Sequence, residues 1–371
     1  MSAPILYGSP RAQKNYITPR YEGISTRKTT SGYNQDRSGS VERYVIPPPP
    51  PSIDDLFQGN SYGYVIGGNY ETSPGVQAAP TFSDFKVKYS LVNDTPSVPS
   101  PGNLTKGVLD NHGHSSGTEG FVSAGRNNSP FPPTVNDIWK FPFASEEVSA
   151  VGALDTVSSL YGHGGVSAVP TGYGYTLAGT YYPTTPPINN FAWDDILKFS
   201  FVTGTASTVG TIIGGAVPGA AGLNSSENGY RVGGQNGRNE VDKFPFANDT
   251  NIAQVATTIV SNLRATANSS QTDGYILDGT ILFPSNPAAI MKLPFSSDTP
   301  AVNVGDAIDA TRFDAAPASG LSNGYSAGGY QPGASPIFLD KISKHNYGSS
   351  VTYSDVASLG LKTANAAGTQ S

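Results

Sequence analysis

Residues 229–246, GYRVGGQNGRNEVDKFPF, decide the fold because the chain repeats both ends of this stretch six times. The first end is a block of Gly, an aromatic residue, two variable residues and a final pair that ends in Gly. It occurs as GYVIGG, GFVSAG, GYTLAG, GYRVGG, GYILDG and GYSAGG, and successive blocks begin 57, 54, 55, 45 and 50 residues apart. A period of about 40–50 residues made of short strands is typical of β-propeller blades.

A lysine-led segment follows each block and forms the second end of the repeat. In KFPF, Phe244 and Phe246 lie two residues apart, so they share one side of a strand. Pro245 cannot donate a ladder hydrogen bond, and we therefore expect an edge strand or a bulge there. We expect the lysines to be structural, with their stems on the sheet and their heads in water. They are Lys88, Lys140, Lys198, Lys243, Lys292 and Lys341.

Two further segments of small and β-branched residues complete the repeat, as in residues 207–212 and 263–270. Four short strands are the composition of one blade. The last residues, 361–371 (LKTANAAGTQS), resemble residues 263–273 but have no glycine block to lead into, and the first block at Gly63 lacks such a strand before it. The sequence therefore predicts an all-β, six-bladed propeller over residues 59–371, closed by a C-terminal strand that joins the first blade.

Residues 1–58 differ from the repeats, and we expect them to form an extended, non-globular arm that ends in a polyproline spacer. Residues 1–50 carry a net charge of +4, whereas residues 51–371 carry −10. So polar an arm cannot fold alone, and we expect it to bind other proteins of an assembly; a tail with incidental charge is the alternative. Its dispersed basic residues and the acidic propeller disfavour nucleic acid as a partner. The candidate partner-binding residues are Arg11, Tyr16, Arg20, Tyr21, Arg27, Lys28, Tyr33, Arg37, Arg43 and Tyr44.

The connections between the glycine blocks and the lysines vary most in length. The lysine follows the last glycine of the block by 20, 15, 19, 9, 13 and 12 residues. Variation at one repeat position falls on one face of a propeller, and loops on a rigid scaffold often bind partners. Aromatic residues there could contact protein or sugar, or could fold onto their own blades: Tyr70, Phe82, Phe131, Tyr181, Tyr182 and Trp193. We expect the last glycine of each block to be structural: Gly68, Gly125, Gly179, Gly234, Gly279 and Gly329.

No motif makes a good case for catalysis or for a cofactor. The chain has no Cys, which excludes disulfides and thiol chemistry. His112 and His114 could place two metal ligands on one face of a strand, but no Cys or close acidic residue accompanies them, so we expect no metal. Two Gly-x-Ser-x-Gly matches, centred on Ser115 and Ser322, run into strand blocks, whereas a nucleophile elbow needs a following helix. The sequence also contains no membrane span and no signal-peptide pattern.

GYVIGG, GYRVGG and GYSAGG resemble the di-glycine strand of kelch repeats. The match is partial, because KFPF stands where kelch blades carry Tyr and Trp, and Trp139 and Trp193 occur in only two blades. The order and spacing of these motifs over residues 60–371 resemble those of repeat proteins of marine cyanobacterial tailed phages.

That resemblance implies a non-enzymatic virion structural protein of the tail, fibre or particle surface. It would be made in the host cytoplasm, present in several copies and held to other virion proteins by its arm. The alternative is a host-attachment module whose loops bind a surface glycan or protein. A cellular kelch-like adaptor is a third hypothesis.

Overall fold

The computed structural model of the protein describes residues 32–35, 41–44, 58–70, 81–127, 134–154, 159–182, 191–212, 215, 217–234, 238–249, 252–259, 264–277, 279, 289–307, 312–331 and 338–371. The chain divides into two units, Met1–Pro51 and Ser52–Ser371. In the first unit, β1 (Gly32–Gln35) and β2 (Val41–Tyr44) pair antiparallel, with Tyr33 opposite Arg43. The other predicted arm residues lie outside the described residues: Arg11, Tyr16, Arg20, Tyr21, Arg27, Lys28 and Arg37.

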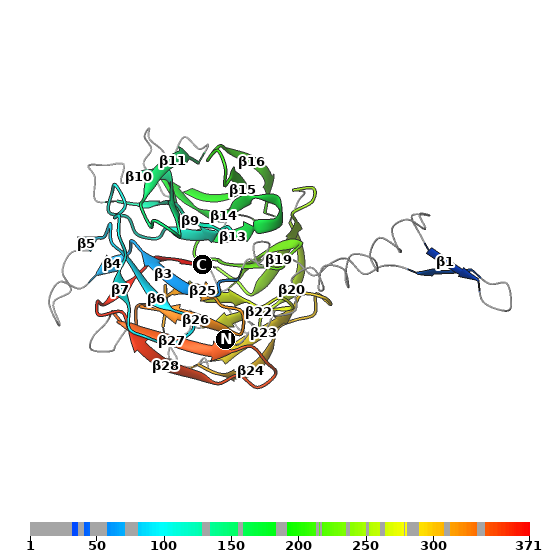
Figure 1. Ribbon diagram of the computed structural model, residues 1–371. Coiled ribbons are helices and arrows are strands. Elements are labelled where there is room, and N and C mark those ends of the chain that lie inside the picture. The colour runs from blue at the N-terminus through cyan, green and yellow to red at the C-terminus, as the bar shows by residue number, and fades with distance from the viewer. Residues whose placement is uncertain are drawn as a thin grey trace, which may run out of the picture. The chain divides into compact units, whose positions relative to one another are not determined.

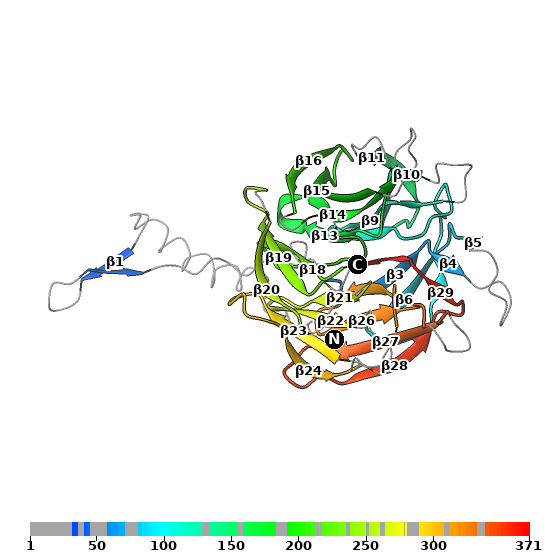
Figure 2. The same cartoon turned by 180° about the vertical axis from the view of Figure 1, so that it is seen from behind.

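The second unit is a six-bladed β-propeller, as the sequence predicts (Figures 1 and 2). Blade 1 combines both ends of the unit. In it β30 (Ala367–Gln370) pairs with β3 (Tyr62–Ile66), which is followed by β6 (Lys86–Ser90) and β7 (Val98–Pro99). A shorter sheet of β29 (Thr363–Ala364), β4 (Asn69–Tyr70) and β5 (Thr81–Phe82) repeats this order. The predicted closure by a C-terminal strand is therefore confirmed.

Blades 2–6 each run from the inner to the outer strand in chain order. Blade 2 contains β8 (His112–Ser115), β9 (Glu119–Arg126), β10 (Thr134–Pro142) and β11 (Ser149–Ala153). Blade 3 contains β13 (Gly164–Ala168), β14 (Tyr173–Tyr182), β15 (Phe191–Ser200) and β16 (Ala206–Thr211), and β12 (Ser159–Tyr161) also pairs with β14. A single 3₁₀ turn, η2 (Val169–Thr171), is the one helical element of the described residues.

The last three blades follow the same plan. Blade 4 contains β17 (Ala221–Asn224), β18 (Asn228–Val232), β19 (Glu240–Pro245) and β20 (Ala253–Thr257). Blade 5 contains β21 (Thr266–Ser269), β22 (Asp273–Leu277), β23 (Ala289–Pro294) and β24 (Val302–Asp306). Blade 6 contains β25 (Ala316–Ser319), β26 (Asn323–Ala327), β27 (Lys341–Asn346) and β28 (Tyr353–Ser358).

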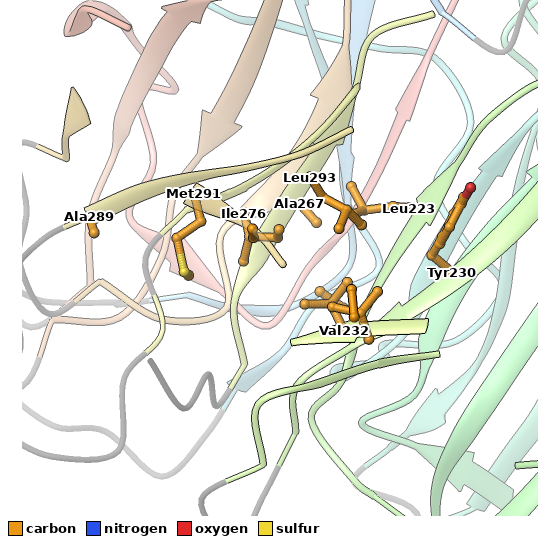
Figure 3. Close-up of a cluster of buried hydrophobic side chains, with 12 residues drawn as sticks. Leu223, Tyr230, Val232, Ala267, Ile276, Ala289, Met291 and Leu293 are labelled. Carbon is orange, nitrogen blue, oxygen red and sulfur yellow. The ribbon is translucent and has the colours of Figure 1, made fainter. Parts of the chain in front are cut away.

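Each interface between neighbouring blades has its own cluster of buried apolar side chains. Figure 3 shows the cluster between blades 4 and 5, in which Tyr230 and Val232 of blade 4 belong with Met291 and Leu293 of blade 5. The aromatic residue of a glycine block packs on the lysine-led strand of the next blade. Tyr175 lies 5.1 Å from Phe244 and 5.4 Å from Phe246 between ring centroids. The two ends of the repeat are thus the two sides of one contact between blades.

Glycine is required at two positions of the repeated block, for two different structural reasons. The Phe244 ring covers Gly229 within blade 4, so an added Cβ would collide with it. The last glycine of each block has a left-handed backbone, which side chains rarely adopt. The φ angles are 97° at Gly68, 121° at Gly125, 137° at Gly179, 124° at Gly234, 66° at Gly279 and 114° at Gly329.

Two local predictions are wrong. In blade 6 the lysine opposite the block aromatic Tyr325 is Lys344, not Lys341, because KISK contains two lysines and the register selects the second. Pro245 belongs to β19, an interior strand, and not to an edge strand. It is the last residue of β19, where the ladder ends, and the bulge lies earlier, between Val241 and Asp242.

Candidate functional site

The antiparallel blades place their connections on two opposite faces. The face that carries the variable connections from the second to the third strand is called the loop face here. The face that carries the turns from the first to the second strand and from the third to the fourth is the turn face. Gln58 lies on the turn face, where its Nε2 donates to the carbonyls of Ser269 at 3.2 Å and Gly320 at 3.0 Å. The described part of the propeller therefore begins on the face opposite the variable connections.

Five of the six predicted loop-face aromatics lie in described strands, near the ends that face the variable connections. Tyr70 ends β4, and its ring centroid is 6.4 Å from that of Phe85. Trp193 in β15 packs against the cluster between blades 2 and 3. The remaining positions are Phe82 in β5, Tyr181 and Tyr182 at the end of β14, and Phe131, which lies outside the described residues. Tyr70 and Trp193 thus have packing partners within the propeller.

The six inner strands enclose a narrow central channel. Small residues or proline line its middle: Gly113, Gly165, Gly222, Ala267, Pro317 and Gly368. A Cβ added at Gly113 would collide with the Gly368 carbonyl oxygen, so neighbouring inner strands touch through their backbones. The cavity is about 80 Å³ at the loop face and about 50 Å³ at the turn face. Since a water needs about 10–15 Å³ and pockets for small molecules measure about 300–1,000 Å³, the channel has room for a few waters or a small ion.

A ring of backbone hydrogen bonds encircles the loop-face end of the channel. Each N–H of the ring donates to the carbonyl of the equivalent residue in the preceding blade, at 2.5–3.2 Å. All six residues have a left-handed backbone, with φ between 53° and 71°. They are Asp110, Gly162, Gly219, Arg264, Asp314 and Asn365.

Charged side chains from three blades meet on this ring, together with Asn365 of blade 1. Arg264 Nη1 lies 2.9 Å from Asp314 Oδ2 and 3.8 Å from Asp110 Oδ1, and Arg126 Nη2 lies 2.5 Å from Asp110 Oδ2. Asn365 Nδ2 donates to both aspartates, at 2.6 Å and 3.0 Å. Burial raises the pKa of Asp314 to about 6, although Arg264 opposes the shift. Two arginines offset two aspartates, so the cluster satisfies its own charges.

A second ring of hydrogen bonds encircles the turn-face end. Here each backbone N–H donates to a side-chain oxygen of the equivalent residue in the next blade. Ser115 N donates to Ser167 Oγ at 3.0 Å, and Ser167 N donates to Asn224 Oδ1 at 3.2 Å. The ring continues through Ser269, Ser319 and Gln370, and Gln370 N donates to Ser115 Oγ at 3.0 Å.

The residues of both rings were missed by sequence reasoning. Their members differ in type and share only their place in the repeat, with five residues from a member of the first ring to one of the second, as from Asp110 to Ser115. That fixed offset was the signal that could have found them.

The histidine and serine motifs have structural partners. His114 Nδ1 lies 3.1 Å from the Val166 carbonyl, and its Nε2 lies 2.9 Å from Ser123 Oγ. Burial lowers the pKa of His112 to about 4 and that of His114 to about 3. In the described part of the chain, no group of three or more His, Asp or Glu residues could hold a metal. Ser115 ends β8 and the next element is the strand β9, so the Ser115 match is not a nucleophile elbow.

No protein-family model matches this chain, and no match is found among curated proteins. Among the described residues, no helix is long and apolar enough to cross a membrane. The β-propeller fold, with connections of unequal length on one face of a rigid ring, indicates a protein-interaction or binding module.

Proposed function

We propose that this chain is a non-enzymatic structural protein of a tailed-phage particle. Its arm binds other virion proteins, and its propeller displays the loop face. The observation that carries the proposal is the position of Gln58 on the turn face, opposite the variable connections. Because the described part of the propeller begins on the turn face, the variable connections on the opposite face remain open to a partner. The resemblance of the repeats to those of marine cyanobacterial phages supports the virion assignment, with synthesis in the host cytoplasm and several copies in each particle.

The channel supports a role without catalysis. Its cavities of about 80 and 50 Å³ are smaller than the space that a small-molecule substrate needs. Asp110 and Asp314 are paired with Arg126 and Arg264 and accept hydrogen bonds from Asn365, so their carboxylates are engaged within the ring. Four ion pairs between a lysine of one blade and an acidic residue of the next favour a rigid platform.

Removal of the arm tests this proposal. The truncated chain should begin at Ser52, because that unit is compact and Gln58 is hydrogen-bonded to the propeller. We expect both chains to fold, and only the full chain to co-purify with virus particles on a density gradient. A full-length variant with Arg20, Arg27 and Arg43 changed to Ser separates specific arm contacts from chain length. If the truncated chain joins particles as well as the full chain does, or if the full chain is never found in particles, the proposal is wrong.

A host-attachment module is the second candidate. The observation that favours it is the length of β14 and β15, which have 10 residues each, whereas β18 and β19 of blade 4 have 5 and 6. The longer hairpin carries Tyr181, Tyr182 and Trp193 on the loop face. The test is binding of the isolated Ser52–Ser371 unit to host-surface polysaccharide, compared with its Tyr181→Ala/Tyr182→Ala variant. Saturable binding that this variant loses would support attachment, and equal binding by both proteins would contradict it.

A further inference from the structure

We propose that the turn-face end of the channel is a binding site for a small monovalent anion, with chloride as the natural occupant. The site is formed by the second hydrogen-bonded ring, in particular by Ser115, Ser167, Asn224 and Ser269 from four successive blades. These residues line the cavity of about 50 Å³.

The serine hydroxyls of the ring act as hydrogen-bond acceptors, so their own protons remain available to donate. Ser115 Oγ, Ser167 Oγ and Ser269 Oγ each accept a backbone N–H from a neighbouring blade. A hydroxyl that accepts in this way still has its own proton to donate. The described residues offer no acceptor to these three hydroxyl protons.

Asn224 also accepts a hydrogen bond in the ring and keeps a donor free. Its Oδ1 accepts the Ser167 N–H, so its amide nitrogen remains a donor at the cavity. Three hydroxyl donors and one amide donor therefore border one small cavity.

The serine donors also have little exposed surface. Ser115 and Ser269 are each 2% exposed, and Ser167 is 6% exposed. A buried donor without an acceptor costs free energy. An occupant of the cavity that only accepts hydrogen bonds satisfies all of them at once, which a water molecule, with two protons of its own, does less well.

The lining of the cavity selects the charge and size of the occupant. It contains no acidic side chain that would repel an anion and no basic one that would offset a double charge. Its single histidine, His114, is neutral and already hydrogen-bonded through both ring nitrogens. Phosphate and sulfate are normally bound by arginine or lysine. A halide, with one charge and a spherical shape, fits a ring of neutral donors.

Crystals of the full chain grown in sodium bromide test the proposal directly, because bromide has an anomalous signal that water lacks. We expect an anomalous peak within hydrogen-bonding distance of Ser115 Oγ, Ser167 Oγ, Ser269 Oγ and Asn224 Nδ2. Water density without an anomalous peak at this position would overturn the proposal.

Thermal unfolding of the full chain gives a solution test. A ligand that binds the folded state raises the midpoint, and we expect a rise of about 2–4 °C in sodium chloride or bromide over sodium gluconate at equal ionic strength. The Asn224→Asp variant keeps the oxygen that accepts the Ser167 N–H but replaces the donor with a negative charge, so it should lose the halide-dependent shift.

Ser200→Ala is the matched control. Ser200 Oγ accepts two backbone N–H groups in a turn of blade 3 outside the cavity lining. This variant should be less stable in both salts and should keep the full halide-dependent shift. The same shift in Asn224→Asp as in the unchanged chain would place halide binding elsewhere and would contradict the proposal.

Discussion

Lys198 Nζ in blade 3 lies 2.6 Å from Asp249 Oδ2 in blade 4, and the Tyr175 hydroxyl donates to Oδ1 of the same carboxylate at 2.6 Å. Three other interfaces carry the equivalent ion pair, between Lys88 and Glu146, Lys243 and Asp298, and Lys344 and Asp94. In all four, the acidic residue has a left-handed backbone in the turn between the third and fourth strands. The expectation that the lysine heads lie in water is therefore wrong for Lys88, Lys198 and Lys243, since each head joins its blade to the next, as Lys344 does in blade 6.

The first prediction concerns this joint. Asp249→Gly retains the left-handed turn but removes the partner of both Tyr175 and Lys198. We expect a loss of about 1–2 kcal/mol in the free energy of unfolding, because the pair is partly exposed and screened. Urea unfolding measures it. In the Asp249→Gly background, Tyr175→Phe should have little further effect; if the two losses add in full, the hydroxyl and the carboxylate are not coupled.

Blade 3 has Gly204 where its neighbours have the acidic residue, and the structure shows why. Gly204 has φ 67°, and a Cβ there would collide with the Val151 carbonyl oxygen of blade 2. Lys140 of blade 2 instead pairs with Glu119 of its own blade at 2.9 Å. The repeat position is thus filled by backbone of the neighbouring blade, which leaves no room for a side chain.

The second prediction follows from this close approach. Gly204→Ala should cost more than about 2 kcal/mol, because the left-handed backbone alone costs about 1–2 kcal/mol and the Val151 carbonyl must also move. Gly360→Ala is the matched control, since Gly360 has φ 68° and nothing within 4 Å of an added Cβ. Chemical unfolding of both variants separates the two costs. Equal losses in the two variants would show that the contact with Val151 adds nothing.

His345 supplies the third prediction. It is fully buried, and neither ring nitrogen has a hydrogen-bond partner. Its equivalents in blades 2, 3 and 4 are Phe141, Phe199 and Phe244, which likewise cover the leading glycine of the block. His345→Phe should therefore raise the free energy of unfolding by about 1–3 kcal/mol, the cost of a buried unsatisfied polar group. His114→Phe should do the opposite, because His114 has partners on both nitrogens. A loss of stability in His345→Phe would contradict this account.

The fourth prediction is the dependence of stability on pH. Burial lowers the pKa of His345 from 6.5 to about 3, so the unfolded chain binds a proton that the folded chain does not as the pH falls through this range. Stability from such a histidine is present above pH 6.5 and is lost as the pH falls, by ~1.4 kcal/mol for each pH unit. Between pH 7 and pH 5, the loss from His345 alone should be about 2 kcal/mol.

Asp314 acts in the opposite direction. Its pKa is raised from 3.8 to about 6, so the folded chain takes up a proton first and is stabilised as the pH falls through that window. This aspartate offsets only part of the histidine effect. Burial also lowers the pKa values of His112 and His114, so these two residues destabilise the folded chain at low pH as His345 does. Urea unfolding at pH 7 and at pH 5 gives the two free energies of unfolding. The difference between these free energies should be smaller in His345→Phe by about 2 kcal/mol, and an unchanged difference would show that His345 is not a proton-linked group.

The sequence predicted the parts of the fold in which residue type repeats. Tyr175 and Phe244 recur with the same chemistry in most blades because they fill the same contact between blades. The two channel rings could not be predicted in this way. Ser115, Asn224 and Gln370 share an acceptor oxygen, and Asp110 and Gly162 share a left-handed backbone. Several residue types meet each requirement, so identity does not repeat even though geometry does.

The fifth prediction tests closure of the propeller. Deletion of residues 367–371 removes β30 from blade 1 and the donor that closes the second ring on Ser115. It also removes the Ser371 carbonyl, which accepts the N–H groups of Asn60 and Ser61 at 2.8 Å each. We expect the deleted chain to lose cooperative unfolding and to aggregate, because β3 becomes an unpaired edge over an open core. Hydrogen exchange of the β3 amides should rise toward that of the unfolded chain. Gln370→Ala keeps β30 and its backbone pairing with β3, so this variant should still unfold cooperatively. A deleted chain that unfolds cooperatively at the midpoint of the full chain would show that the propeller does not depend on this closure.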